Sequence, residues 1–218
     1  DYVRVVDYKT GNKELSLSEL YYGLQMQLVI YLKASIDKKS KAEKIVVPAG
    51  MLYYRIKDPI FNEKVTPENF EQKTLESLAM NGLVNGDFPM LEGSDRNLEQ
   101  NNGVYQPDYV SSVSNIETGK KGQLKKSSGV TNTDCLNELI KFTEKKVVDM
   151  SEEILDGKTL VNPYKTNESQ PKSACMYCAF RSVCRFDSRL YGNDYRVFEK
   201  LSDDDVMRII HGELSEEE

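Results

Sequence analysis

The chain has 218 residues and a formal charge of -6, and 39% of its residues are hydrophobic and 29% charged. This size and composition are typical of a water-soluble globular protein with one sizeable core, and we expect it in the cytoplasm. No apolar run is long enough to span a bilayer, so we expect no membrane contact. The negative charge excludes a surface that is basic throughout, so any contact with nucleic acid would depend on local basic patches.

The first predicted element is a strand over residues 1–9, where the order DYVRVVDYK is rich in β-branched residues. Successive side chains of a strand alternate between faces, so we expect Asp7 and Lys9 on one face and Tyr8 on the other. The sequence enters this strand at once without an initiator Met, which we interpret as an N-terminally truncated fragment. Asp-x-Lys can hold Mg²⁺ on its carboxylate and orient a water with its lysine, but alone it is more typical of a surface ion pair.

A helix is predicted over residues 16–35 and a second strand over residues 49–59. The helix is apolar on nearly every side, as a buried helix is. Its spacing places Gln27 and Tyr31 on one helical stripe among leucines. Because buried polar groups need partners, this pair is either a core amide and phenol bonded to the backbone or part of a functional site.

A further helix is predicted between Thr66 and Gly82, with its apolar residues facing inward. Residues 83–130 then lose periodicity and fill with Gly, Asn, Ser and charge, which predicts a long flexible excursion with one hairpin near GQLKKSSGV, residues 122–130. A long amphipathic helix follows, and Gly157 closes it. The order of strands and helices predicts an α/β fold.

Three of the four cysteines lie close together in CMYCAFRSVC, as Cys175, Cys178 and Cys184. A soft-metal site usually has four protein ligands, so these thiols are one short. Clustered cysteines do not suggest a disulfide framework. The remaining Cys135 lies beside the apolar stripe of the long helix, which favours a small buried hydrophobe, and zinc held by all four cysteines is the alternative.

Several segments together resemble the RecB-like family of PD-(D/E)xK nucleases, and within it the B subunits of AddAB/RexAB-type helicase-nucleases. They are VVDYKTG, the helix bearing QLVIY, the strand MLYYRI, and C-x2-C-x5-C followed by RFD. The resemblance implies a restriction-endonuclease-like core, a mixed sheet flanked by helices. It also implies Mg²⁺-dependent exonuclease cleavage of DNA in break processing and recombinational repair, with an AddA/RexA-like helicase-nuclease chain as the heterodimer partner.

The resemblance also implies roles for individual residues of the first strand and helix. Asp7 would be a metal-binding carboxylate, the main-chain carbonyl of Tyr8 a further metal ligand, and Lys9 the catalytic lysine. Gln27 and Tyr31 match the Gln-x-x-x-Tyr motif that lies beside the active site in this family. We expect the second metal-binding aspartate of the family upstream of the first residue, so the fragment alone should be nearly inactive.

By the same resemblance, Cys175, Cys178 and Cys184 would supply three ligands of a [4Fe-4S] cluster, with the fourth cysteine expected upstream of the first residue. We therefore divide the chain into three parts. They are a partial nuclease core over residues 1–170, a cysteine clasp segment over residues 171–190 and an acidic tail over residues 191–218.

A non-catalytic DNA-binding or scaffolding relative, with the cysteines only as a metal clasp, is the alternative hypothesis. The presence of Asp7, Lys9 and Gln27 favours the nuclease. The single histidine, His211, lies in the acidic tail, which disfavours nucleophilic catalysis by a Cys/His or Ser/His pair. No G-x-x-x-x-G-K-[ST] loop occurs, so an ATP-driven motor would belong to another chain or region.

Overall fold

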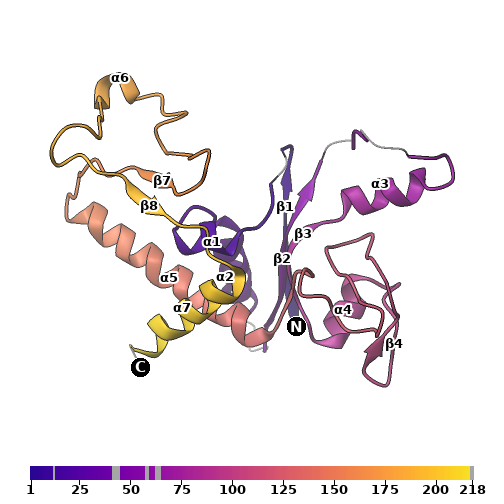
Figure 1. The fold of residues 1–218 in the computed structure, drawn as a ribbon. Coiled ribbons are helices and arrows are strands. Elements are labelled where there is room, and N and C mark those ends of the chain that lie inside the picture. The colour runs from indigo at the N-terminus through magenta and orange to yellow at the C-terminus, as the bar shows by residue number, and fades with distance from the viewer. Residues whose placement is uncertain (12, 41–44, 57–58, 62–64, 217–218) are drawn as a thin grey trace. The chain divides into compact units, whose positions relative to one another are not determined.

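The computed structural model consists of two compact units (Figure 1). The described residues are 1–11, 13–40, 45–56, 59–61 and 65–216. The first unit contains residues 1–16 and 25–143, and the second contains residues 17–24 and 144–218. None of the helices in the described ranges combines the length and the apolar character that crossing a membrane requires.

A four-stranded sheet forms the centre of the first unit, in the order β1-β2-β3-β6 (Figure 1). The strands are β1 (Tyr2–Lys9), β2 (Val47–Arg55), β3 (Asn81–Asn85) and β6 (Val130–Thr131). β1 runs parallel to β2, β2 antiparallel to β3, and β3 parallel to β6. The predicted mixed sheet of an α/β fold is thereby confirmed.

Helices pack against this sheet and close its hydrophobic core. α2 (Gln27–Ser40) packs against β1 and β2, and α4 (Phe88–Ser94) packs against β3. The buried side chains of α2 are Leu28, Val29 and Leu32. A second cluster contains Leu52, Val84, Leu91, Leu98 and Ile116. Each of these large apolar side chains contributes about 1.5–3 kcal/mol by its burial, so the sheet is held by packing as well as by its hydrogen bonds.

The register of β1 and β2 determines which side chains share a face of the sheet. Asp7 lies opposite Tyr53, and Lys9 lies opposite Arg55. Paired residues of neighbouring strands point to the same side, so these four side chains share one face. Tyr8 lies on the other face, where its ring centroid is 5.6 Å from that of a tyrosine of β2. The predicted alternation along β1 is confirmed.

The single helix predicted over residues 16–35 is wrong, because the chain forms α1 (Leu17–Tyr21) and then α2 with a turn between them. Gly23 adopts a φ of 83° in this turn. Its N–H donates to the carbonyl of Leu20 at 2.8 Å, which ends α1. The apolar residues continue across the turn, so periodicity alone did not show the break.

The helix predicted between Thr66 and Gly82 is shorter than expected and faces solvent. α3 (Phe70–Leu78) has no buried residue. Phe70 and Leu75 are 55% and 46% exposed, so their predicted inward orientation is wrong. Gly82 does not stop a helix, because it lies within β3.

The segment over residues 83–130 contains more regular structure than its composition predicts. It includes α4 and a two-stranded hairpin of β4 (Gln100–Asn101) and β5 (Val104–Tyr105), which lies earlier in the chain than the hairpin predicted near residues 122–130. Asp95 is only 1% exposed, and its carboxylate accepts hydrogen bonds from the hydroxyls of Tyr109 and Ser111. Elements of two to seven residues are too short to give a periodic pattern. The flexibility of this segment stays a prediction.

The long predicted helix is α5 (Thr133–Leu155), which runs from the first unit into the second. Gly157 has a φ of 69° and its N–H donates to the carbonyl of Ile154 at 3.1 Å, as the sequence predicts for the helix end. The other elements of the second unit are β7 (Tyr164–Thr166), α6 (Arg181–Cys184), β8 (Arg196–Phe198) and α7 (Asp203–Ser215). β7 and β8 pair in parallel.

The acidic end of the chain contains α7, whose sequence explains where the helix begins. The Ser202 side chain caps it by accepting from the N–H of Asp205 at 3.2 Å. Acidic residues in the first turn interact favourably with the helix dipole. Val206 and Ile210 are fully buried, so this helix contributes to the core of the second unit.

Gly82→Ala should destabilise the first unit. Gly82 has a φ of 152°, and a Cβ there would lie 2.1 Å from the carbonyl oxygen of Met51. We expect the free energy of unfolding to fall by about 2 kcal/mol or more, measured by urea denaturation of the purified protein. Gly93→Ala is the matched control, because nothing lies within 4 Å of its added Cβ in α4, and it should keep or raise stability. Equal effects of the two changes would contradict the close approach of β2 and β3.

Candidate functional site

Four polar side chains meet where β1 ends and α2 begins. Lys9 Nζ lies 2.7 Å from Asp7 Oδ2 and 3.0 Å from Gln27 Oε1, to which it donates. Gln27 Nε2 in turn donates to the Tyr31 hydroxyl at 2.9 Å. The sequence-predicted residues of the strand and of the helix are therefore in one connected group. Tyr8 points its side chain to the opposite face, so only its main chain could take part in the group.

Local sequence explains how α2 presents its two polar residues. Gln27 and Tyr31 are four residues apart, so they lie one above the other on one side of the helix. Buried Leu28 and Leu32 follow each of them directly and anchor the helix. Gln27 is exposed and Tyr31 is 46% exposed, so the alternative of a buried core amide and phenol is wrong.

The electrostatics of the group favour the charged form of Lys9. The carboxylate beside it is largely enclosed. The side chain of Lys9 is 30% exposed and that of Asp7 is 20% exposed. Contact with the Asp7 carboxylate raises the pKa of Lys9 above its ordinary value. Asp7 Oδ2 is enclosed and, within the described residues, has this ion pair but no hydrogen bond of good geometry. Such an oxygen suits a further electrostatic partner such as a cation.

Asp7 fits a divalent cation as one ligand of a larger set. Mg²⁺ prefers oxygen ligands and usually takes one or two carboxylates together with waters and substrate phosphates. Across the described ranges, no group of three or more His, Cys, Asp and Glu side chains is arranged to hold a metal ion. The enclosed Asp7 oxygen supplies the donor chemistry, and a complete set would need further oxygens.

The three clustered thiols lie around α6. Cys175 is half-buried, whereas Cys178 and Cys184 are exposed. Their soft sulfur donors suit zinc or an iron-sulfur cluster. As placed in the part of the chain that the structure describes, they do not form a metal-binding group. Cys135 is half-buried at the start of α5 and is not the fully buried residue that the sequence favours.

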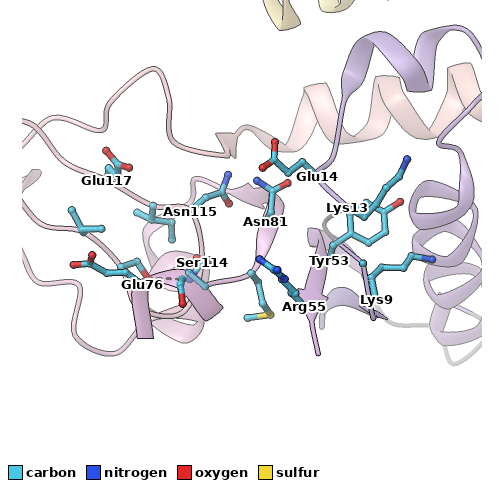
Figure 2. A pocket seen from close by; sticks show the side chains of 17 residues that line it. Lys9, Lys13, Glu14, Tyr53, Arg55, Glu76, Asn81, Ser114, Asn115 and Glu117 are labelled. Atoms are coloured by element: carbon cyan, nitrogen blue, oxygen red, sulfur yellow. Dashed lines mark hydrogen bonds between the residues drawn. The ribbon is translucent and has the colours of Figure 1, made fainter. Parts of the chain in front are cut away.

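A polar pocket that the sequence analysis missed lies beside Lys9, and Figure 2 shows the side chains around it. Its volume is about 250 Å³. Its polar lining residues include Lys9, Arg55, Asn81, Ser114 and Asn115. Arg55 could have been found from the period of two along the second strand, since it follows Tyr53 on the same face. Ser114 and Asn115 carry no signal in the sequence, because they reach the pocket by tertiary folding alone.

The site is thus the Asp-x-Lys end of a strand of a mixed sheet, with its lysine bonded to Gln27 of the flanking helix and Gln27 bonded to Tyr31. A family model described as the PD-(D/E)XK nuclease superfamily matches residues 1–185. The chain belongs to the PD-(D/E)XK nuclease superfamily. The predicted restriction-endonuclease-like class is thereby confirmed.

Curated relatives match nearly the whole chain. It is 34% identical over 221 residues to the B subunit of the ATP-dependent helicase/deoxyribonuclease of Clostridium kluyveri, covering 99% of this chain and 18% of that protein. It is 36% identical over 214 residues to the protein of the same name from Lachnoclostridium phytofermentans, covering 97% and 18%. The protein of that name from Clostridioides difficile is 32% identical over 219 residues, covering 98% and 18%. The chain thus spans about a fifth of the length of these relatives.

Gln27→Ala should leave the stability of the protein nearly unchanged. The amide is exposed and its hydrogen bonds lie at the surface, so we expect the free energy of unfolding to change by less than about 1 kcal/mol. Leu28→Ala at the next position should cost about 2–5 kcal/mol, because that side chain is fully buried. Urea denaturation of both variants measures the difference. A large loss in Gln27→Ala would mean that the residue has a structural role.

Proposed function

We propose that the chain is the nuclease domain of the B subunit of a helicase-nuclease, and that it hydrolyses phosphodiester bonds of DNA in the whole protein. Membership of the nuclease superfamily and the names of the relatives support this proposal. The observation that carries it is the position of Lys9 Nζ, in contact with both Asp7 and Gln27. A non-catalytic scaffold would have no need to hold this ammonium in one place.

The proposed mechanism assigns a distinct task to each residue of the group. Asp7 and the main-chain carbonyl of Tyr8 would hold Mg²⁺, with further oxygens from substrate phosphates, water and any carboxylate from other parts of the protein. The bound ion would supply Lewis-acid stabilisation of the charge on the phosphoryl group. Lys9 would offset developing negative charge and orient the attacking water. Gln27 positions Lys9 through its Oε1, and Tyr31 fixes the orientation of the Gln27 amide.

The clustered cysteines support a second proposal, about stability. Cys175, Cys178 and Cys184 would supply three ligands of a [4Fe-4S] cluster, and zinc is the alternative. The described arrangement does not gather the thiols, so binding would require the segment around α6 to close and a further ligand to join. Such a site would stabilise the fold by linking distant parts of the chain, and it would take no part in cleavage.

The proposed setting follows from the names of the relatives. These names describe one subunit of a larger enzyme, which implies a companion chain. We propose an AddA/RexA-like helicase-nuclease chain as the heterodimer partner, with DNA as the substrate. The reaction would be exonuclease digestion at DNA double-strand breaks in recombinational repair, in the cytoplasm. A non-catalytic DNA-binding relative is the second hypothesis, and cleavage assays decide between them.

Lys9→Ala in the full protein, assayed with a partner chain whose own nuclease site has been inactivated, should reduce DNA cleavage by a factor of about 100 or more, because the positive charge beside the phosphoryl group is lost. Binding of DNA should change little. Cleavage of an end-labelled duplex with Mg²⁺ measures the first effect, and fluorescence anisotropy without metal measures the second. Lys33→Ala is the matched control, since that lysine pairs with Asp37 at 2.8 Å on an exposed part of α2. Full cleavage by the Lys9 variant would refute the nuclease assignment.

Cys178→Ser in the full protein should remove the visible absorption and the stoichiometric iron and sulfide of a [4Fe-4S] cluster, because a hydroxyl is a poor substitute for a thiolate. Cys135→Ser should retain both. We also expect a lower unfolding temperature for Cys178→Ser alone. Stoichiometric zinc in place of iron would favour the alternative metal, and loss of the cluster in Cys135→Ser would identify that residue as a ligand.

A further inference from the structure

The polar pocket beside Lys9 contains an unusual concentration of unpaired polar atoms. Arg55 Nε, Ser114 Oγ and Asn115 Oδ1 are enclosed and have no hydrogen-bond partner among the described residues. All three residues line this pocket. In Figure 2, Arg55 lies in the middle, with Lys9 and Tyr53 on one side of it and Ser114 and Asn115 on the other. Ser114 is only 1% exposed. Enclosed polar atoms cost free energy unless they are paired, and these atoms have almost no exposed surface, so a ligand in the pocket would pair with them once the three side chains turn toward it.

The main chain holds the serine and the asparagine of this pocket in fixed positions. Ser114 forms a β-bridge with Met80, and its N–H donates to the Ser111 hydroxyl at 3.2 Å. The N–H of Asn115 donates to the carbonyl of Met80 at 3.0 Å, and its carbonyl accepts from Gly129 at 3.0 Å. Arg55 is the last residue of β2. The main chain at these residues is therefore held by hydrogen bonds to neighbouring segments, which favours a binding site.

The charges around the pocket favour a neutral ligand over a phosphate. The lining includes the cations Lys9, Lys13 and Arg55, and the carboxylates Glu14, Glu76 and Glu117. Three acidic residues oppose three basic ones, and the ammonium of Lys9 is directed away toward Asp7 and Gln27, so the lining as a whole does not attract an anion. The unpaired atoms also include an acceptor, Asn115 Oδ1, which a phosphodiester without a donor would leave unpaired.

A nucleobase matches both the hydrogen-bonding pattern and the size. The edge of a base offers acceptors and donors side by side, and arginine and asparagine are frequent partners of such edges. A volume of about 250 Å³ is below the usual 300–1,000 Å³ of sites for drug-sized ligands, so it suits one small ring system. Met80 and Val110 in the lining offer apolar contact to the ring.

We propose that this pocket binds one unpaired nucleobase of the DNA strand on which the Asp7 and Lys9 site acts. With the three side chains turned toward the base, Arg55 Nε and the Ser114 hydroxyl donate to acceptors on the base edge, and Asn115 Oδ1 accepts from an amino or imino group. The inference rests on the proposed nuclease function, because Lys9 borders both the pocket and that site. A paired base cannot present its edge to these atoms, so the pocket selects a single-stranded segment.

Ser114→Ala separates a binding role from a structural one. Its hydroxyl has no hydrogen bond among the described residues, so the variant should keep the unfolding temperature of the wild type. Binding of a single-stranded oligonucleotide to the full protein, measured with EDTA to prevent cleavage, should weaken roughly five- to ten-fold, as for one lost hydrogen bond. Ser112→Ala in the same loop is the matched control and should bind as the wild type does.

Arg55→Lys should weaken binding to a similar or greater extent, because lysine keeps the charge and loses the planar Nε–H. Arg4→Lys is its control, since Arg4 is exposed on β1 and does not line the pocket. If Arg4→Lys weakens binding as much as Arg55→Lys does, the effect comes from replacing any arginine by lysine. That result would overturn the role of Arg55 Nε.

Oligonucleotides with one abasic residue at successive positions identify the ligand. At one position the missing base should weaken binding to the wild type about as much as Ser114→Ala does, and the two changes together should cost no more than either alone. Additive losses, no sensitive position, or unchanged binding by Ser114→Ala would overturn the proposal and leave a pocket that holds water only. If no abasic position weakens binding but a neutral methylphosphonate linkage does, and this loss does not add to that of Ser114→Ala, the pocket is a phosphate site and the proposal is overturned.

These measurements are independent of cleavage. If Lys9→Ala cleaves DNA like the wild type while the abasic and Ser114→Ala effects coincide, the nuclease assignment fails and the base pocket stands. If Lys9→Ala abolishes cleavage while Ser114→Ala binds normally, the nuclease assignment stands and the base pocket fails.

Discussion

The parallel pairing of β1 with β2 is the constraint on which the candidate site depends. Its register places Asp7 beside Tyr53 and Lys9 beside Arg55. A slip of one residue would turn every side chain of β1 to the opposite face of the sheet. The ion pair of Asp7 and Lys9, the hydrogen bond to α2 and one wall of the polar pocket therefore depend on the same main-chain hydrogen bonds.

β2 is in turn fixed from its other side by a close approach to β3. Gly50 and Gly82 both have a positive φ, and a side chain on either would meet the main chain of the opposite strand. Without these side chains the two strands lie close together, and Met51, Leu52 and Tyr53 are at most 4% exposed. Because β2 is buried between two neighbours, β1 can carry a charged strand end at the solvent boundary and keep its position.

Local rules predicted the parts of the site that lie within one element. The period of two along β1 placed Asp7 and Lys9 together, and helical spacing placed Gln27 near Tyr31. Their meeting across two elements followed from a family resemblance, because no local pattern records which face of a strand a helix covers. The polar pocket was missed for the same reason. The pocket combines the end of a strand with residues near Ser114, which β-bridges and short turns bring there. The break between α1 and α2 was missed because apolar residues continue through the turn at Gly23.

Lys9 links the two environments that this arrangement creates. Its ammonium contacts Asp7 and Gln27 on the side of α2, and Figure 2 shows it directed away from Ser114 and Asn115. The aliphatic part of the Lys9 side chain borders the polar pocket, so the charged end and the aliphatic part contact different neighbours. A strand whose phosphate lies at the ammonium would thus have its next bases near the pocket. The position of Lys9 would then make cleavage of the backbone depend on whether the adjoining base is unpaired.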